Sequence, residues 1–320
     1  MDTPVMFSAP PKLMRDVVIE KIHNAARKDK DILFISADLG AAALDDFRSD
    51  LPDQVIFAGV SEQNMVDLAS GLALSDKKVF LYGMAPFITA RCYEQVKCVI
   101  ASMHLPVTLI GVGVGLGYDH ATLTHFTPED VACMRSLNGI EILSPSDEES
   151  ATIMATEAIN NPAFRYIRLE RKAQDHIYHG EFTKALERGF AQLGEGRDVA
   201  IVACGYMLHK ALKAQKILAD KDVSAGVIDL FRIKRVNVTG LSEILARYNT
   251  LLTVEEQQLE GGFGSAVMEA LVDRNSFKPV KRLGIRDGFV VVNGDRDTLH
   301  DLYGIDTPHI VEAALTLRGS

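Results

Sequence analysis

One acidic side chain stands at a place in the chain where proton transfer could occur. The segment Gly59-Val-Ser-Glu62 follows an apolar run and opens a stretch of helical periodicity. In that position Ser61 would cap a helix, and Glu62 would lie in its first turn, where the helix dipole stabilises a carboxylate. The same carboxyl group could serve as a general acid or base. Taken alone, the position favours the structural role of Glu62 and leaves the catalytic role open.

Two histidines and an aspartate share a long predicted loop. Asp119, His120 and His125 lie between an apolar run and a helical segment that starts at Pro128. The spacing of the two histidines on a loop is not a recognised zinc-ligand pattern. We therefore expect acid–base catalysis or contact with substrate oxygens rather than metal binding. A surface loop without a chemical role is the alternative.

Positive charge gathers after another apolar run. Arg168 and Arg171 fall at the end of this run, beside Lys172. Guanidinium groups form charge-assisted hydrogen bonds with carboxylates and phosphates, so these arginines could hold an anionic substrate. A solvated strand end without a ligand is the alternative.

A glycine-rich run, Gly111-Val-Gly-Val-Gly-Leu-Gly117, precedes the histidine loop. Its glycines alternate and never form the GxGxxG pattern of dinucleotide-binding folds, and no helical segment follows directly. We therefore expect a strand end packed so tightly that a side chain would not fit. The sequence also lacks GxxxxGK[ST], HExxH and GxSxG, the markers of nucleotide hydrolysis, zinc proteolysis and serine hydrolysis.

Short apolar runs alternate with helical segments along almost the whole chain. This alternation is typical of parallel sheets covered by helices, so we expect an α/β protein with two consecutive open, mostly parallel sheets and helices on both faces. For the first sheet the sequence predicts strands at Ile32–Ser36, Val55–Ala58, Val79–Tyr82, Val107–Val112, Glu141–Leu143 and Tyr166–Leu169, with helices near 12–29, 62–75, 89–103, 128–138 and 147–160. For the second sheet it predicts strands at Val199–Ala203, Ser224–Ile228, Leu251–Val254 and Arg282–Ile285, with helices near 207–220, 239–248, 263–273 and 306–317.

A polar stretch at 172–187 interrupts the periodicity, and the segment 194–198 leads into a new strand. We therefore place a domain boundary near residue 190, which gives domains 1–190 and 191–320. Ligands of such sheets bind at the carboxyl ends of strands, where loops lead into helix amino termini. The candidate residues described above follow predicted strands of the first sheet, so we expect the chemistry at that edge.

Charge and cysteine content exclude several classes of partner. The chain has 34 Lys and Arg against 43 Asp and Glu, a net charge of -9, and no basic block for nucleic acid or an anionic membrane. The run 98–118 is uncharged and as long as a membrane span, but Pro106 and its glycines predict a helix end, a turn at 104–106 and a buried strand. The four cysteines form no CxxC pair, and the start, Met1-Asp2-Thr3-Pro4, lacks the pattern of a signal peptide. We therefore expect a reducing, cytoplasmic setting.

Six short motifs occur in order along the chain. They are Ser36-Ala-Asp-Leu39, Gly59-Val-Ser-Glu62, Arg91-Cys-Tyr-Glu-Gln95, Gly115-Leu-Gly-Tyr-Asp119 with Thr124-His125, Val254-Glu-Glu-Gln257 and Gly261-Gly-Phe-Gly264. In order and spacing they resemble the carboxyl-terminal half of transketolase, meaning its pyrimidine-binding domain followed by its carboxyl-terminal domain. The motif that begins at Arg91 is most similar to the related deoxyxylulose-phosphate synthases. The resemblance covers nearly the whole chain.

This resemblance implies thiamine diphosphate as the cofactor. Glu62 matches the family's glutamate, whose carboxyl group binds a nitrogen of the aminopyrimidine ring and shifts that ring to its imino form. In the family the ring also stacks on an aromatic side chain. Alignment without gaps from Tyr93 puts Ile88 at the stacking position, whereas a one-residue shift would put Phe87 there. Arg91, in the same motif, is expected to contribute to cofactor binding.

The resemblance also implies a set of substrate contacts. His125 matches the histidine that contacts substrate oxygens and assists proton transfer, and Asp119 matches the acid that recognises a substrate hydroxyl group. His120 stands where the family usually has glycine, which implies a different substrate preference. Arg15 and Arg171 fall where transketolase holds the sugar phosphate through charge-assisted pairs.

One family motif is missing from this chain. One-chain relatives bind the diphosphate and its Mg²⁺ through GDG in a preceding domain, and no GDG occurs here. The resemblance therefore implies the carboxyl-terminal subunit of a split transketolase, which moves a two-carbon ketol unit between sugar substrates. We expect an amino-terminal partner subunit to hold the diphosphate and Mg²⁺, no metal ligand in this chain, and an α2β2 tetramer. The alternatives are a related thiamine diphosphate synthase, a 2-oxoacid dehydrogenase beta subunit, or a non-catalytic module of the same fold.

Overall fold

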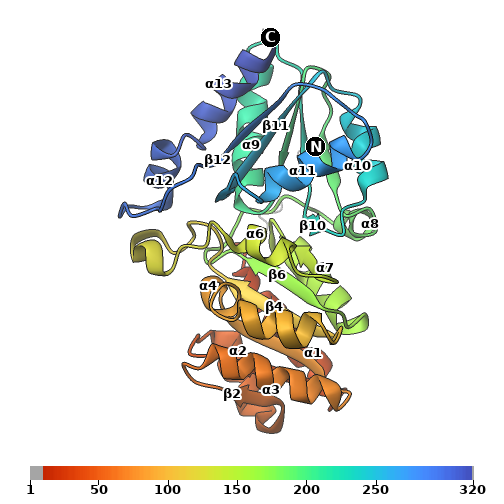
Figure 1. Cartoon of the computed structure of the whole chain (residues 1–320), viewed down its shortest axis with the longest axis vertical. Helices are drawn as coiled ribbons and strands as arrows, with labels where there is room; N and C mark the ends of the chain where they lie inside the picture. The colour runs from red at the N-terminus through yellow and green to blue at the C-terminus, as the bar shows by residue number, and fades with distance from the viewer. Residues whose placement is uncertain (1–9, 319–320) are drawn as a thin grey trace, which may run out of the picture.

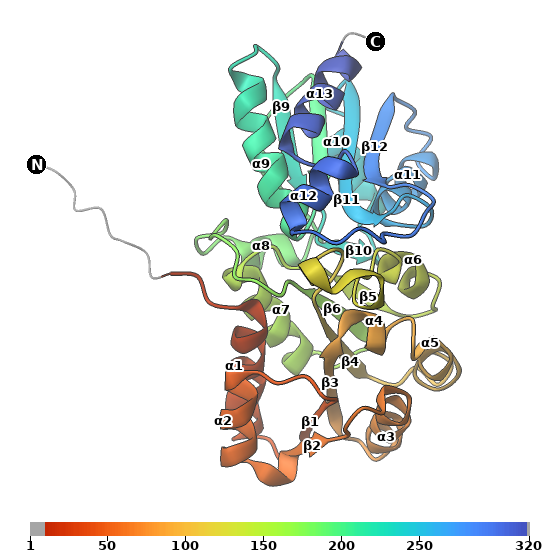
Figure 2. The same cartoon turned by 90° about the vertical axis from the view of Figure 1, so that its left-hand side faces the viewer.

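The protein forms two α/β units that lie one above the other along its long axis (Figure 1). The computed structural model describes residues 10–318, so the start, Met1-Asp2-Thr3-Pro4, lies outside the described residues. A quarter turn shows the amino-terminal unit below and the carboxyl-terminal unit above, each with a central sheet (Figure 2). Both predicted sheets form, and the predicted fold class is confirmed.

Seven strands form the first sheet, in the order β10-β5-β6-β4-β3-β1-β2. Six of them are parallel and match the predicted strands: β1 Ile32–Ser36, β2 Val55–Phe57, β3 Lys78–Met84, β4 Val107–Val112, β5 Glu141–Leu143 and β6 Arg165–Leu169. Because β1, β4, β5 and β6 are buried along their whole length, they are mostly apolar in the sequence. The seventh strand, β10 (Arg232–Lys234), was not predicted; it pairs antiparallel with β5 and brings the later chain back to the first sheet.

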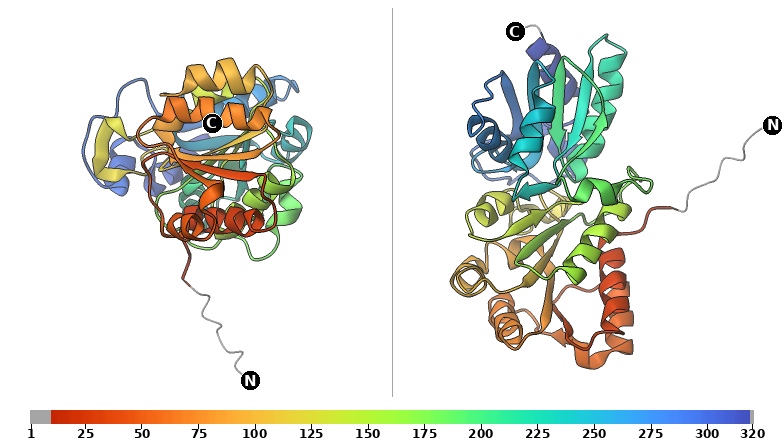
Figure 3. Two further views of the ribbon diagram at one scale, coloured as in Figure 1. Left: turned by 90° about the horizontal axis from the view of Figure 1, so that it is seen from below. Right: turned by 90° about the vertical axis from the view of Figure 1, so that its right-hand side faces the viewer.

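Helices cover both faces of the first sheet. On one face pack α1 (Met14–Ala26), α2 (Ala42–Asp50) and α7 (Glu148–Asn160), and on the other α3 (Glu62–Leu74) and α6 (Asp130–Arg135). Seen from below, the red α1 and the orange-to-gold helices lie on opposite sides of the strands (Figure 3, left). The predicted helices at 12–29, 62–75 and 147–160 are confirmed, the one at 128–138 is shorter, and α2 was not predicted.

The helix predicted at 89–103 is present but shorter, because only residues 93–101 form a continuous helical stretch. It contains α5 (Tyr93–Gln95) and the π-helical η2 (Val96–Ala101), and a turn separates it from the preceding α4 (Ala85–Ile88). The fully buried side chains still recur every four residues, at Ile88, Cys92, Val96 and Ile100. The periodicity therefore predicts the buried face but not the breaks in the backbone.

The uncharged run 98–118 is divided as predicted. It contains the end of η2, a turn and the buried strand β4. Within residues 10–318, no helix has the length and hydropathy that would suit a membrane span.

Five strands form the second sheet, in the order β12-β11-β8-β9-β7. Their bounds are β7 Ala191–Gly194, β8 Val199–Ala203, β9 Ala225–Asp229, β11 Thr250–Gln258 and β12 Val280–Ile285. The helices of this part of the chain are α8 Phe182–Leu186, α9 Tyr206–Ala219, α10 Val238–Leu245, α11 Phe263–Val272, α12 Arg296–Leu302 and α13 Thr307–Arg318. The predicted strands and helices are present, with β11 longer than predicted. The antiparallel strand β7 and the short helices α8 and α12 were not predicted.

One hydrophobic core joins the two units. Met134 of α6 and Ile142 of β5 belong to the same cluster of buried side chains as Ile233 of β10 and Phe263 of α11. Separate clusters lie beneath α1 and α2 in the first unit and beneath α9 and α13 in the second. Because apolar side chains pack continuously across the boundary, the two units are held in a defined relative position.

A buried carboxyl group also lies at the contact between the units. Asp229 ends β9, and its Oδ2 accepts hydrogen bonds from Tyr178 Oη (2.7 Å) and Ser146 Oγ (3.2 Å). Within residues 10–318, its Oδ1 has no hydrogen-bond partner. Burial raises the pKa of Asp229 to about 7, and the neighbouring Asp147 adds to the shift.

The raised pKa of Asp229 predicts a pH-dependent stability. Between the ordinary pKa of 3.8 and about 7, the folded protein keeps a proton that the unfolded chain has lost, so stability falls as pH rises. The contribution of this group is up to about 4 kcal/mol. We expect the free energy of unfolding, measured in urea, to fall less for Asp229→Asn than for the wild type as pH rises through this range. The exposed Asp220→Asn serves as a control that keeps the wild-type slope; an unchanged slope in Asp229→Asn would contradict the prediction.

Candidate active site

A cavity of about 270 Å³ opens at the carboxyl edge of the first sheet. Side chains that follow three neighbouring strands line it: Asp38 and Leu39 after β1, Val60 and Glu62 after β2, and Phe87 and Arg91 after β3, together with His125. Because β1, β2 and β3 are parallel and adjacent, their carboxyl ends meet at one edge. Glu62, Phe87, Arg91 and His125 were all singled out from the sequence, and the structure brings them together.

Glu62 opens α3 and is only 5% exposed. Its Oε2 accepts a hydrogen bond from Arg91 Nη1 at 2.9 Å, which gives the buried carboxylate a positively charged partner. The expected side-chain cap by Ser61 does not form, because the Ser61 hydroxyl donates instead to the carbonyl of Ala58 at 2.6 Å. Glu62 is therefore stabilised by an ion pair as well as by its place at the start of the helix.

The short helix α4 turns Phe87 and Ile88 in different directions. Ile88 is fully buried in the hydrophobic core, where its Cγ2 lies 2.7 Å from the position of a Cβ on Gly83. Phe87 is half-buried and lines the cavity. Of the two residues considered for stacking, the structure places Phe87 at the cavity and Ile88 away from it.

Two side chains contact the ring of Phe87. The guanidinium carbon of Arg91 lies 3.8 Å from the ring centroid, which is a cation–π contact. The imidazole of His125 meets the same ring edge-on, with the centroids 5.4 Å apart and the planes inclined by 63°. Phe87 therefore connects the Glu62–Arg91 pair to His125.

The glycine run ahead of His125 is packed as predicted. A Cβ on Gly113 (φ +78°) would lie 1.9 Å from the Tyr118 ring, and one on Gly115 (φ +58°) would lie 2.5 Å from Glu256 Oε2. Gly115 also forms an antiparallel bridge to Thr127. These close contacts turn the chain back toward the sheet and thereby place His125 at the cavity.

The three candidate polar residues of this loop each have a different partner. The Nδ1 of His125 is 2.8 Å from the hydroxyl of Thr124. Asp119 is buried, and its carboxylate pairs with Lys172 at 2.5 Å. His120 is exposed, and its Nδ1 is 3.2 Å from Asn293 Oδ1 of the second unit. Only His125 lines the cavity itself.

A second group of polar side chains continues from His125. Tyr118 packs against His125 with the ring centroids 5.6 Å apart, and the Arg171 guanidinium lies 4.9 Å above the Tyr118 ring. Burial raises the pKa of Tyr118, and the charges of Arg171 and Arg15 partly oppose the rise. Burial also raises the pKa of Tyr82, which lies within β3. Both tyrosines therefore keep their hydroxyl protons at neutral pH.

Two polar atoms in this group have no hydrogen-bond partner within residues 10–318, namely Tyr82 Oη and Arg15 Nε. Arg15 Nε nevertheless lies 3.6 Å from Asp16 Oδ1, in an ion pair. Buried polar groups are nearly always paired, so unpaired ones suggest a place for a ligand or an ordered water. Tyr82 was not singled out from the sequence; a tyrosine that ends the predicted strand Val79–Tyr82 could have indicated it.

Residues 11–175 match the family described as "Transketolase, pyrimidine binding domain", and residues 190–310 match "Transketolase, C-terminal domain". The chain belongs to the transketolase family. The resemblance identified from the six motifs is therefore confirmed.

Two relatives of similar length carry informative names. A protein of Phocaeicola vulgatus, named as one of the subunits of an apulose-4-phosphate transketolase, is 33% identical over 91% of this chain and 92% of its own length. A protein of a Clostridium species, named as a subunit of a 6-deoxy-6-sulfo-D-fructose transketolase, is 31% identical over 94% of this chain and 93% of its own. A solved structure described as "Split gene transketolase, inactive beta4 tetramer" is 28% identical, with a TM-score of 0.86 over 96% of this chain and 98% of its own.

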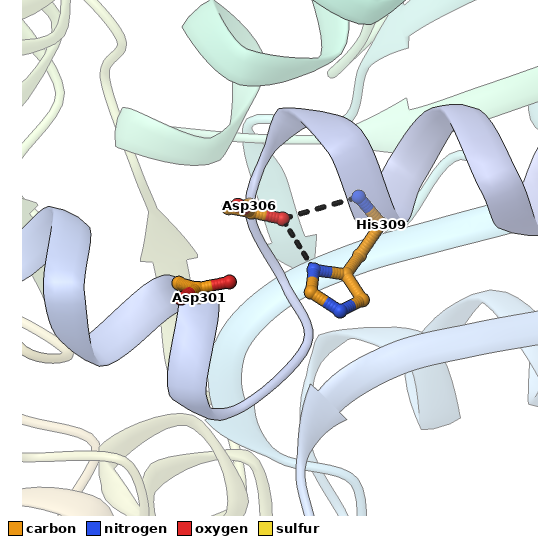
Figure 4. Close-up of side chains that lie close together, drawn as sticks. All are labelled: Asp301, Asp306 and His309. Atoms are coloured by element: carbon orange, nitrogen blue, oxygen red, sulfur yellow. Dashed lines mark hydrogen bonds and ion pairs between the residues drawn. The ribbon is translucent and has the colours of Figure 1, made fainter.

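One group of side chains among residues 10–318 could hold a metal ion. This group lies away from the cavity of this transketolase-family chain. It consists of Asp301, Asp306 and His309 around the junction of α12 and α13 (Figure 4). Asp306 Oδ1 accepts hydrogen bonds from the backbone N–H (3.1 Å) and Nδ1 (2.5 Å) of His309, so it already serves as the cap of α13.

Arg168 does not join the other candidate residues of this family member. It is 2% exposed, and its Nε and Nη2 donate to Asp130 Oδ2 (2.8 Å) and Oδ1 (3.1 Å). Its Nη1 donates to Ser144 Oγ at 3.1 Å. The guanidinium is thus satisfied inside the protein, which argues against the expected contact with an anionic substrate. Arg171, in contrast, is exposed.

The two arginines give a direct test of this difference. Arg168→Met would leave Asp130 buried without its partner, so we expect a loss of about 3–5 kcal/mol in the free energy of unfolding. Arg171→Met removes an exposed charge and should cost less than about 1 kcal/mol. Chemical denaturation of both variants measures the difference. Equal losses would contradict a structural role for Arg168.

Proposed function

We propose that this chain is the carboxyl-terminal subunit of a split, thiamine diphosphate-dependent transketolase that transfers a two-carbon ketol unit between sugar substrates. The observation that carries the proposal is the cavity in which the buried carboxylate of Glu62 and the ring of Phe87 stand together, with His125 against that ring. Glu62 and His125 match the residues that the family uses on the cofactor ring and on the substrate, and Phe87 is the aromatic side chain that lines the cavity beside them.

The cavity fits an aminopyrimidine ring. Phe87 offers an aromatic face, and Glu62 offers a buried carboxylate that already binds the N–H of a planar cation. When bound, thiamine diphosphate supplies a carbon nucleophile that cleaves and forms carbon–carbon bonds next to a carbonyl group. Glu62 would hold and exchange a proton with a ring nitrogen, and Phe87 would fix the plane of the ring. The candidate metal group among residues 10–318 is elsewhere, so we assign Mg²⁺ and the diphosphate to the partner subunit.

His125 is assigned to substrate oxygens. The hydrogen bond between Nδ1 and Thr124 orients the imidazole, so Nε2 is the nitrogen that we expect to reach the substrate. From this position, His125 would donate a proton to, or accept one from, a substrate hydroxyl or carbonyl oxygen as the carbon–carbon bond changes. Asp119 and His120 are proposed as neighbours of the substrate rather than as part of the cavity wall.

An anionic end of the sugar is assigned to Arg15 and Arg171. Both lie near Tyr118, which in turn packs against His125. Tyr82 Oη adds a hydroxyl donor that has no hydrogen-bond partner within residues 10–318. The names of the two relatives include a phosphate and a sulfonate, and both groups carry negative oxygens that such donors can bind. The identity of the sugar is left open by this proposal.

The partner is proposed from the names of the relatives and from the surface around the cavity. The two relatives are named as transketolase subunits, and the similar solved structure is described as an inactive beta4 tetramer of a split-gene transketolase. In this chain Phe57, which ends β2, and Val60, which lines the cavity in the loop before α3, are both exposed, and Leu68 and Leu74 are exposed farther along α3. Exposed apolar groups clustered at one place favour an interface. We propose that an amino-terminal subunit covers this mouth in an α2β2 assembly.

The first test is the requirement for a partner and the choice of donor. We expect the chain alone, supplied with thiamine diphosphate and Mg²⁺, to transfer no ketol unit, and the complex with its partner subunit to use ketoses. The aldose released from the donor measures the transfer. Turnover of pyruvate in place of ketoses would instead assign a synthase or dehydrogenase subunit, and no thiamine-dependent turnover would assign a non-catalytic module.

The second test is Glu62→Gln in the assembled complex. Glutamine can still form a hydrogen bond to the ring nitrogen but cannot exchange its proton, so we expect retained binding of thiamine diphosphate and a loss of kcat of at least about 100-fold. Calorimetric titration measures binding, and steady-state kinetics measure turnover. The exposed Glu94→Gln on α5 is the control and should keep the wild-type rate. A rate near wild type for Glu62→Gln would remove this residue from the proposed role.

A further inference from the structure

We propose that Arg91 occupies the aminopyrimidine subsite in the unassembled chain and must leave it when the cofactor binds. This inference rests on the proposed function and deepens it, because it assigns a regulatory contact to the same cavity. Arg91 would then be a residue that keeps the subsite filled, and its movement would accompany cofactor binding.

The geometry of Arg91 matches what the cofactor ring would need. Its Nη1 lies 2.9 Å from Glu62 Oε2, and its guanidinium carbon lies 3.8 Å from the centroid of the Phe87 ring. A guanidinium is a planar, delocalised cation with N–H donors in its plane. A protonated aminopyrimidine has the same character: a flat N–C–N cation that donates in its plane and stacks through its face. A planar cation that binds Oε2 of Glu62 and covers this face of Phe87 occupies the position that Arg91 holds, so the two cannot be there together.

The charge of Glu62 explains why the subsite would be filled. The Glu62 side chain is 6% exposed, and a buried carboxylate without a partner is costly. In the unassembled chain Arg91 supplies the positive charge. When the cofactor binds, the proton shared with its ring would take over that function. The Glu62 carboxylate therefore has a positively charged or proton-donating partner both in the unassembled chain and in the cofactor-bound complex. Replacement of Arg91 by the cofactor ring leaves no buried charge unpaired.

The surroundings of Arg91 allow it to move. Its side chain is 41% exposed, and it stands in the turn between α4 and α5. An ion pair with one partly exposed member is weakened by solvent, so its loss is offset by hydration of the guanidinium. In the pair of Arg168 and Asp130 both side chains are buried, with exposures of 3% and 0%. Solvent therefore cannot hydrate the Arg168 guanidinium if that pair breaks. Of these two arginines, only Arg91 is placed to turn outward.

A fixed role for Arg91 predicts the opposite outcome. If Arg91 only held Glu62 in position for the cofactor, its removal would weaken binding of thiamine diphosphate. If Arg91 competes with the ring, its removal strengthens binding, because the cofactor no longer has to displace it. The sign of the change in affinity therefore separates the two roles.

The first measurement is calorimetric titration of thiamine diphosphate, with Mg²⁺ present, into the complex of this chain with its partner subunit. We expect Arg91→Gln to lower Kd by about fivefold or more, from the combined loss of an exposed ion pair and a cation–π contact. Arg91→Lys keeps the charge but not the plane and should fall between. Arg188→Gln is the matched control, because the exposed Arg188 lies over the Phe190 ring at 5.9 Å, away from the cavity and from the proposed partner interface; its Kd should stay unchanged.

The second measurement needs no cofactor. In urea unfolding of the isolated chain, Arg91→Gln should be destabilising, and the loss should shrink when Glu62→Gln is already present, because the pair is then broken from both sides. Additive losses, or a Kd in the complex that is unchanged or raised by Arg91→Gln, would overturn the competition while leaving the proposed function intact. Failure of the wild-type complex to bind thiamine diphosphate would overturn both.

Discussion

A buried carboxylate that must have a partner determines the arrangement of the candidate site. Glu62 is 5% exposed at the start of α3. The helix dipole is worth about 1 kcal/mol to such a group, whereas burial of an unpaired carboxylate costs several kcal/mol. The dipole alone is therefore insufficient, and the cavity must always contain a cation or a proton donor beside Glu62. Arg91 meets this need, and Phe87 provides the flat face on which a planar cation can rest.

The second unit supports the site without lining the cavity. The loop that carries His125 packs against Glu256 of β11, close enough that Gly115 has no room for a side chain. Glu256 is fixed in turn by an ion pair with Arg296 and a hydrogen bond with His300 Nε2, and the Arg296 charge holds the pKa of Glu256 well below the ordinary range despite burial. Arg296 also pairs with Glu170 of the first unit at 2.7 Å. A buried ion network therefore fixes the position of the histidine loop against both sheets.

The parts of the fold that were predicted from the sequence are those that local pattern determines. Buried parallel strands are mostly apolar runs, so β1 to β6 could be located, but β10 is three residues, two of them charged, and its pairing with β5 depends on distant chain. The break between α4 and α5 was missed because burial every four residues continues across it. Strand order likewise depends on contacts that a single sequence does not reveal.

In the candidate site, too, only the residues that stand in local sequence motifs could be predicted. Glu62 and His125 stand in motifs that follow strands, so their meeting at one edge could be expected. Arg168 could not be separated from Arg171 by pattern, because its partner Asp130 is distant in the chain. The choice between Phe87 and Ile88 depended on the direction of one helical turn, which alignment does not give.

The shape of the cavity bears on why one chain would be insufficient for the proposed chemistry. At about 270 Å³ it lies just below the usual range of small-molecule pockets, about 300–1,000 Å³. One of its walls is Val60, which is 72% exposed. Proton exchange between Glu62 and a ring nitrogen is most effective where water is excluded, because electrostatic interactions are stronger there. On the proposed function, a second polypeptide must therefore close the mouth of the cavity beside Val60. Binding of that polypeptide with its cofactor would displace Arg91 and exclude water from the Glu62 carboxylate.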